Sequence, residues 1–119
     1  MAQLPTLSKG STGDAVKGLQ NALNARSYPV AVDGTFGAST EGAVKQFQGN
    51  AALEADGIVG PNTWRELNVY MVQSGDTLSA IAEQQLGDAE RWAEVFELNR
   101  HLISDPDRIS PGQLLALPN

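Results

Sequence analysis

The chain has 119 residues, a formal net charge of −6 and no cysteine. Its length allows one ordinary domain or two very small ones. The absence of cysteine excludes disulfides, thiolate metal sites and cysteine nucleophiles. A histidine-based zinc site usually needs two or three histidines, and this chain has only His101. We therefore predict no metal site and no cofactor.

The charge is uneven along the chain. Residues 1–68 carry five basic and six acidic side chains, whereas residues 69–119 carry three basic and eight acidic ones. An acidic balance disfavours contact with nucleic-acid phosphates and with anionic membrane surfaces. We therefore expect no nucleic-acid partner, and we interpret the charge first as a solubilising surface.

The apolar residues are too dispersed for a membrane-spanning segment, which needs roughly 20 consecutive ones. Residues 1–5 lack the basic and apolar regions of a signal peptide. Residues 1–6 are expected to form a flexible arm. These features predict no membrane span. The location would be the cell wall, the periplasm or the medium if the chain is exported, and otherwise the cytoplasm or a larger particle.

A turn motif occurs twice, at residues 33–40 and 56–63, and reads D-G-x-(F/V)-G-x-x-T in both copies. Asp-Gly favours a tight turn because glycine tolerates positive φ and aspartate can bond to the nearby backbone. Phe36 and Val59 are expected to point inward as anchors. Each copy leads into apolar residues at helical spacing, and Pro61 suits a first helical position. The repeat predicts two similar corners that close one small helical bundle.

Three helices are predicted in residues 7–67, from Asp14 to about residues 25–27, from about residue 38 to 50, and from residue 61 to 67. Thr12 or Asp14 could cap the first helix. Gly18 inside it costs about 1 kcal/mol relative to alanine, and we expect it to allow another backbone to pack closely.

The second half has a different periodicity. Residues 70–73 alternate like a strand, and residues 114–117 predict a short buried strand. Between them, Asp76 is expected to cap one helix, which ends at Gly87, and Asp88 to cap another. The core face of that second helix is predicted to hold Trp92, Val95 and Phe96. The order β-α-α-β predicts an antiparallel strand pair with both helices on one face, so the fold class of the whole chain is α+β.

No set of residues makes a convincing catalytic centre. Asp33 and Asp56 could be offered as the carboxylate pair of a glycosidase, but each is explained by its turn. Asp105 and Asp107 are best explained by a turn around a proline, and His101 by a solvated helix end. We therefore predict that the chain is not an enzyme and has no catalytic residues.

The N-terminal motifs are Leu7-x-x-Gly10-Ser11-x-Gly13-x-x-Val16-x-x-Leu19-Gln20-x-x-Leu23, Val32-Asp33-Gly34-x-Phe36-Gly37-x-x-Thr40-x-x-Ala43-Val44-x-x-Phe47-Gln48 and Asp56-Gly57-x-Val59-Gly60-Pro61-x-Thr63-Trp64-x-x-Leu67. On these motifs, residues 7–67 resemble the peptidoglycan-binding domain family. The resemblance implies a three-helix bundle of a kind often attached to wall hydrolases. Ser27 and Ala52 stand where the family usually has glycine, which affects the local turns.

The C-terminal motifs are Tyr70-x-Val72-x-x-Gly75-Asp76-Thr77-Leu78-x-x-Ile81-Ala82, then Asn99, then Ile109-x-Pro111-Gly112-Gln113-x-Leu115-x-Leu117-Pro118. On these residues, the segment 70–118 resembles a lysin-motif (LysM) domain. The segments 83–92 and 100–108 are longer than in a minimal copy. The resemblance implies binding of N-acetylglucosamine-containing glycans, as in peptidoglycan or chitin.

The resemblance also implies where the glycan binds. Two loops should meet at one end of the sheet and form a shallow groove, with these binding residues: Gly75, Asp76, Thr77, Leu78, Arg108, Ile109 and Ser110. A helix cap at Asp76 and core positions for Leu78 and Ile109 are alternative interpretations. A second possible groove lies in the first segment, with these candidates: Tyr28, Asp33, Phe36 and Trp64. Packing favours a core position for Phe36, whereas Tyr28 and Trp64 are open between core and groove.

These observations favour a non-catalytic, monomeric binder of peptidoglycan or N-acetylglucosamine glycans with two modules, 7–67 and 70–118. Two weak sites on one chain would raise avidity if both reach one polymer. One alternative is a structural adaptor or baseplate-type part of a phage tail or contractile injection particle. Another is the targeting part of a wall hydrolase.

Overall fold

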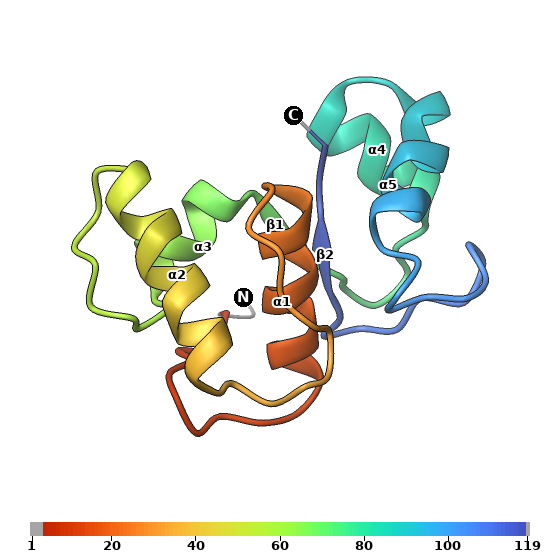
Figure 1. The fold of residues 1–119 in the computed structure, drawn as a ribbon. Coiled ribbons are helices and arrows are strands. Elements are labelled where there is room, and N and C mark those ends of the chain that lie inside the picture. Colours follow the sequence, from red (N-terminus) through yellow and green to blue (C-terminus); the bar gives the residue numbers. More distant parts are fainter. Residues whose placement is uncertain (1–3, 119) are drawn as a thin grey trace.

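The computed structural model describes residues 4–118 and shows a helical N-terminal half followed by a small mixed C-terminal half (Figure 1). The helices of the N-terminal half, residues 4–68, are α1 (Asp14–Ala25), α2 (Ala38–Asn50) and α3 (Pro61–Leu67). The C-terminal half, residues 69–118, contains β1 (Val69–Met71), α4 (Leu78–Leu86), the 3₁₀ helix η1 (Ala89–Arg91), α5 (Trp92–Leu98) and β2 (Leu114–Ala116). The expected α+β class is confirmed.

The two turn copies anchor the first core as predicted. Phe36 and Val59 are 1% and 0% exposed, and both lie in one cluster with apolar residues of all three helices. The main chain of Leu7 pairs with that of Val59, which ties the N-terminal segment to the second turn. The helices α1, α2 and α3 begin after Gly13, Gly37 and Gly60 without a side-chain cap, so the expected cap by Thr12 or Asp14 is wrong.

Residues 4–6 of the predicted arm contact the N-terminal half. Leu4 packs against its core, and the carbonyl of Pro5 accepts a hydrogen bond of 2.7 Å from the indole Nε1 of Trp64. Residues 1–3 of that arm lie outside the described residues.

The C-terminal half forms the expected antiparallel pair, with Tyr70 opposite Leu115 and Met71 opposite Leu114. Because side chains alternate along a strand, β2 has two apolar faces. Leu115 and Leu117 lie in one core with α4 and α5, whereas Leu114 and Ala116 lie in the core of the N-terminal half. Figure 1 shows the consequence, with β2 standing between α1 and the α4–α5 pair.

Gly18 of α1 makes this packing possible. A Cβ atom at this position would lie 2.8 Å from the Cβ atom and 3.2 Å from the carbonyl oxygen of Leu114. Contacts this short are repulsive, so only glycine lets the strand lie directly on the helix. The close approach expected at Gly18 is thus confirmed, and its partner is β2 of the C-terminal half.

Hydrogen bonds join the same two halves, and the one between Asn21 and Asn99 is buried. The Nδ2 atom of Asn21 in α1 donates to the carbonyl of Leu98 (2.9 Å) and to Oδ1 of Asn99 (2.8 Å). The Nη2 atom of Arg26 donates to the carbonyl of Leu117 at 2.7 Å, and its Nε donates to Leu67 at 3.2 Å. Partial burial lowers the pKa of Arg26 from its ordinary value.

Asn99 is 0% exposed and acts as the connector of the C-terminal half. Its Nδ2 donates to the carbonyls of Val95 (2.7 Å) and Ala116 (2.9 Å), and its Oδ1 accepts from the Ala116 backbone N–H (2.8 Å). The bond from Asn21 completes the set. One side chain therefore fastens α5 to β2 and is itself held by α1.

Two expectations about the C-terminal half are wrong. Asp76 does not cap α4, because Thr77 occupies that position and its Oγ1 accepts from the Ala80 N–H at 3.2 Å. Trp92 is not a core residue, although it lies one helical turn before the buried Val95, and 40% of it is exposed. It begins the short helix α5 and borders an open groove where the sequence pattern predicts a core.

Candidate functional site

A groove of about 360 Å³ lies between the two loops that the sequence predicts to meet. This volume is at the lower end of the range for small-ligand sites. Its lining comes from the start of α4, from the start of α5 and from the loop before β2: Asp76, Thr77, Leu78, Ser79, Trp92, Pro106, Asp107 and Ile109.

The loop before α4 is held in place by Asp76. The Oδ2 atom of Asp76 accepts hydrogen bonds from the Tyr70 hydroxyl (2.6 Å) and from the Gln73 backbone N–H (2.8 Å). The bond to a carboxylate raises the pKa of Tyr70 to about 12, because the neutral hydroxyl is the donor and its ionised form would repel Asp76. Gly75 takes φ 87°, a conformation that glycine accepts without strain. This wall of the groove is therefore built before any ligand arrives.

The opposite loop is shaped by Asp105. Its Oδ1 accepts from the Asp107 backbone N–H at 2.9 Å, and its carbonyl accepts from the Arg108 N–H at 3.0 Å. This is the turn that the sequence predicts around Pro106. As a result, the exposed Asp107 and the half-buried Ile109 both border the groove.

Four of the seven predicted glycan-binding residues line this groove, namely Asp76, Thr77, Leu78 and Ile109. Gly75, Arg108 and Ser110 lie in the same loops without lining it. Leu78 is only 3% exposed, so most of its side chain belongs to the core. Asp107 belongs to the second of the two predicted loops and also lines the groove, whereas the sequence did not indicate Ser79, Trp92 or Pro106 as part of this surface. Trp92 lies three residues before Val95, and this helical spacing predicted a core position for Trp92 instead.

The candidates in the N-terminal half do not form one exposed surface. Phe36 and Trp64 are each 1% exposed, so both rings are covered by protein. Tyr28 is half-buried, packs edge-on against Phe47 with ring centroids 5.5 Å apart, and accepts a hydrogen bond from Asn50. The exposed Asp33 carboxylate accepts hydrogen bonds from the Thr35 backbone N–H and from the Gln20 side chain. These bonds lower the pKa of Asp33, and the bond from Thr35 has the larger effect. Binding of a ligand by these four residues stays a prediction.

Two buried glutamines organise the repeated turns, and sequence reasoning gave them no role. In the first copy, Gln20 Nε2 donates to Asp33 Oδ1 and Thr40 Oγ1, and its Oε1 accepts from the Gly34 N–H. In the second copy, Gln48 makes the equivalent bonds at 3.3, 3.1 and 3.0 Å. A signal was present, because each glutamine directly follows a core residue, Leu19 or Phe47, on the inner side of its helix.

Other kinds of site receive no support from the described residues. Within residues 4–118, no three carboxylate or histidine side chains come together as a possible cation site. None of the helices in that part of the chain is long and apolar enough to cross a bilayer.

The fold and the groove define a class of protein with two small modules, a three-helix unit and a small mixed unit that carries a groove. Residues 12–67 match the family described as a putative peptidoglycan binding domain, and residues 70–118 match the LysM domain. The chain therefore contains a putative peptidoglycan binding domain, residues 12–67, followed by a LysM domain, residues 70–118.

Individual curated proteins are similar to parts of this chain. The potassium binding protein Kbp of Escherichia coli is 49% identical over 49 residues, which is 41% of this chain and 33% of that protein. The zinc D-Ala-D-Ala carboxypeptidase of Streptomyces albus G is 43% identical over 76 residues, which is 60% of this chain and 28% of the enzyme. The chain thus spans about a third of the length of these two relatives.

A solved structure has a similar fold over about half of this chain. A peptidoglycan-binding protein from Clostridioides difficile, crystallised with glutamine hydroxamate, is 40% identical with a TM-score of 0.54. The match covers 56% of this chain and 42% of that one.

Proposed function

We propose that this chain is a non-catalytic module pair that binds peptidoglycan or a related glycan containing N-acetylglucosamine. The observation that carries the proposal is the groove between the Asp76–Ser79 segment and the Pro106–Ile109 loop. Its walls combine apolar side chains with hydroxyls and carboxylates. This mixture suits an amphipathic sugar ring that carries an acetamido group. A place in or on the cell wall follows from the same proposal.

The two halves are fixed to one another by Gly18, Asn21 and Arg26. Sites on such a body cannot reorient independently, as they could on a flexible linker. Polymer strands that present both epitopes at the matching spacing would bind with increased avidity, and other strands would engage one half only.

Co-sedimentation of the full chain with purified sacculi and with chitin tests the proposal. We expect the wild-type chain to pellet and free N-acetylglucosamine oligomers to release it. The variant Ile109→Asp should pellet at least about ten-fold less well, because a charge enters the groove. The matched control is Ile58→Asp, at a 47% exposed position in the N-terminal half. A wild-type chain that pellets with neither polymer would refute the proposal.

A second candidate function is the targeting part of a larger wall hydrolase. The similarity to a zinc D-Ala-D-Ala carboxypeptidase, of which this chain spans 28%, favours it. In that case, fusion of the chain to an unrelated wall-cleaving domain should lower the enzyme concentration needed to clear a sacculus suspension. Equal clearing with and without the fusion would count against it. A role in a phage tail or injection particle stays a prediction.

A further inference from the structure

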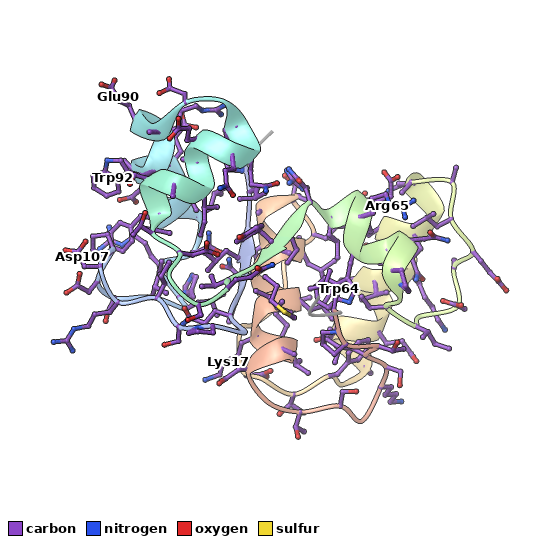
Figure 2. The ribbon with its side chains drawn as sticks, turned by 180° about the vertical axis from the view of Figure 1, so that it is seen from behind. Lys17, Trp64, Arg65, Glu90, Trp92 and Asp107 are labelled. Atoms are coloured by element: carbon purple, nitrogen blue, oxygen red, sulfur yellow. The ribbon has the colours of Figure 1, made fainter. Side chains whose placement is uncertain are left out.

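Trp92 is an unusual feature of the C-terminal half. The described residues expose only two large apolar side chains strongly, Ile58 at 47% and Trp92 at 40%. Ile58 borders a hollow of about 200 Å³ in the N-terminal half. Trp92 borders the larger groove of about 360 Å³, together with Pro106, Asp107 and Ile109. Figure 2 shows the labelled Trp92 and Asp107 on the same side of the molecule.

The position of Trp92 is set by local structure. Asp88 caps the 3₁₀ turn before it, through a 2.9 Å bond from the Glu90 N–H to Oδ1. Behind it, Arg91 bonds to Glu94 through both Nε and Nη2 at 2.8 Å, which fixes the first turn of α5. The indole is therefore held at the groove by a short, well-connected element, and little ordering would be needed when a ligand arrives.

The groups around the indole match the two kinds of surface on a sugar ring. A pyranose has an apolar C–H face and a rim of hydroxyls. A flat aromatic face packs favourably on the first. A carboxylate accepts strong hydrogen bonds from the hydroxyl rim. Asp107, whose side chain is a carboxylate, lines the same groove, as do the hydroxyl-bearing residues Thr77 and Ser79.

The charges in this groove restrict the kind of ring further. The charged residues in its lining, Asp76 and Asp107, are both acidic. The neighbouring Arg108 has 86% of its side chain exposed and lies 3.9 Å from Asp105, and Arg91 is bonded to Glu94. The carboxylate of an acidic sugar would meet like charge here, which disfavours its binding.

We propose that Trp92 and Asp107 form a subsite for one uncharged pyranose ring, stacked on the indole with its hydroxyls donating to the Asp107 carboxylate. This subsite rests on the proposed glycan-binding function and adds a preference to it. Uncharged N-acetylhexosamine residues are accepted, and rings that bear a carboxylate are disfavoured.

Titration of the full chain with N-acetylglucosamine oligomers of one to five units tests the subsite, with calorimetry and tryptophan fluorescence as measurements. Trp64 is 1% exposed, so ligand-dependent protection from iodide quenching reports on Trp92. Trp92→Ala should weaken binding of the tetramer about five- to ten-fold, and Trp92→Phe should retain part of the affinity. Ile58→Ala, the other exposed apolar position, should bind like the wild type.

The charge preference has its own test with the disaccharide of N-acetylglucosamine and N-acetylmuramic acid. Asp107→Asn should bind this acidic disaccharide more tightly than the wild type, while its affinity for the neutral tetramer falls only slightly. Equal changes for both probes would overturn the preference.

The outcomes separate the two proposals. The wild type, Trp92→Ala and Ile58→Ala could bind the tetramer equally, and the ligand could fail to protect Trp92 of the wild type from iodide. This result would refute the subsite and leave the proposed function standing. A wild-type chain that binds neither oligomers nor sacculi would refute both. Unchanged thermal unfolding of Trp92→Ala would establish that its loss of binding is local.

Discussion

The two halves of the molecule close their cores in different ways. The N-terminal half surrounds its apolar residues with three helices and a paired segment at Leu7 and Val59. The C-terminal half covers one face of its sheet with α4 and α5 and leaves the other face, Leu114 and Ala116, to α1. Small domains bury little surface by themselves. The second half therefore gains stability by sharing β2 with the first.

This difference predicts one cooperative unfolding transition for the whole chain. The largest effect is expected for Asn99→Ala, which removes the partners of Ala116, Val95 and Asn21 in a fully buried place. Loss of several buried hydrogen bonds should lower the free energy of unfolding by about 4 kcal/mol. The control Asn21→Ala removes only the two bonds from α1, to Leu98 and Asn99, and should cost about 2 kcal/mol.

Chemical denaturation monitored by circular dichroism would measure both variants. Two separate transitions in the wild-type chain would show that the halves fold independently, and the shared-strand interpretation would then be wrong.

The next largest effect is expected at Gly18. The change Gly18→Ala forces β2 away from α1, and overpacking typically costs about 1–3 kcal/mol, partly offset by a gain in helix propensity of about 1 kcal/mol. The matched control is Gly42→Ala in α2, where a Cβ atom would meet nothing within 4 Å. It should stabilise the chain by about 0.5–1 kcal/mol. Thermal melts that shift in the same direction for both variants would contradict the proposed contact.

Tyr70 gives a smaller effect, confined to the C-terminal half. Tyr70→Phe removes the bond to Asp76 and should lower stability by about 1 kcal/mol near neutral pH. Because folding raises the pKa of Tyr70 from 10.0 to about 12, this stabilisation is complete below pH 10 and is lost as the pH rises to 12.

Urea melts of the wild type and Tyr70→Phe across this pH range would measure the difference. A difference that stays constant up to pH 12 would argue against the Tyr70–Asp76 bond.

The smallest effects concern strained turns, in which the halves again differ. Ser27 and Ala52 in the N-terminal half take φ of 71° and 60°, whereas positive φ in the C-terminal half falls on Gly75, Gly87 and Gly112. Ser27 and Ala52 occupy the two positions at which the peptidoglycan-binding domain family usually has glycine. Ala52→Gly should stabilise the chain by about 0.5 kcal/mol, because relief of strain exceeds the added freedom of the unfolded chain.

The neighbouring Ala51 has φ −92° and provides the control. Ala51→Gly gains no relief and should destabilise the chain by about 0.5–1 kcal/mol in the same thermal melt. Equal shifts for Ala51→Gly and Ala52→Gly would show that strain at Ala52 is negligible.

The local structure of this protein is determined by its sequence. Helical periodicity and the doubled turn place α1, α2 and α3 closely, since each element depends on neighbours a few residues away. The meeting of the loops at residues 75–78 and 107–110 was predicted as well, but from the resemblance to LysM domains and not from the local sequence pattern. The roles of Gln20 and Gln48 were not predicted, because both glutamines lie outside the two turn motifs and bond to residues later in the chain.

The tertiary structure alone decides what lies against each surface. The periodicity of α5 marks Trp92 as inward, and only the fold shows that a groove lies there in place of a core. Likewise, the sequence predicts that β2 is a buried strand, but the alternation of its side chains does not show which elements cover its two faces. The contact of Gly18 with Leu114 joins residues far apart in the chain, and such long-range packing depends on the shape of both halves together.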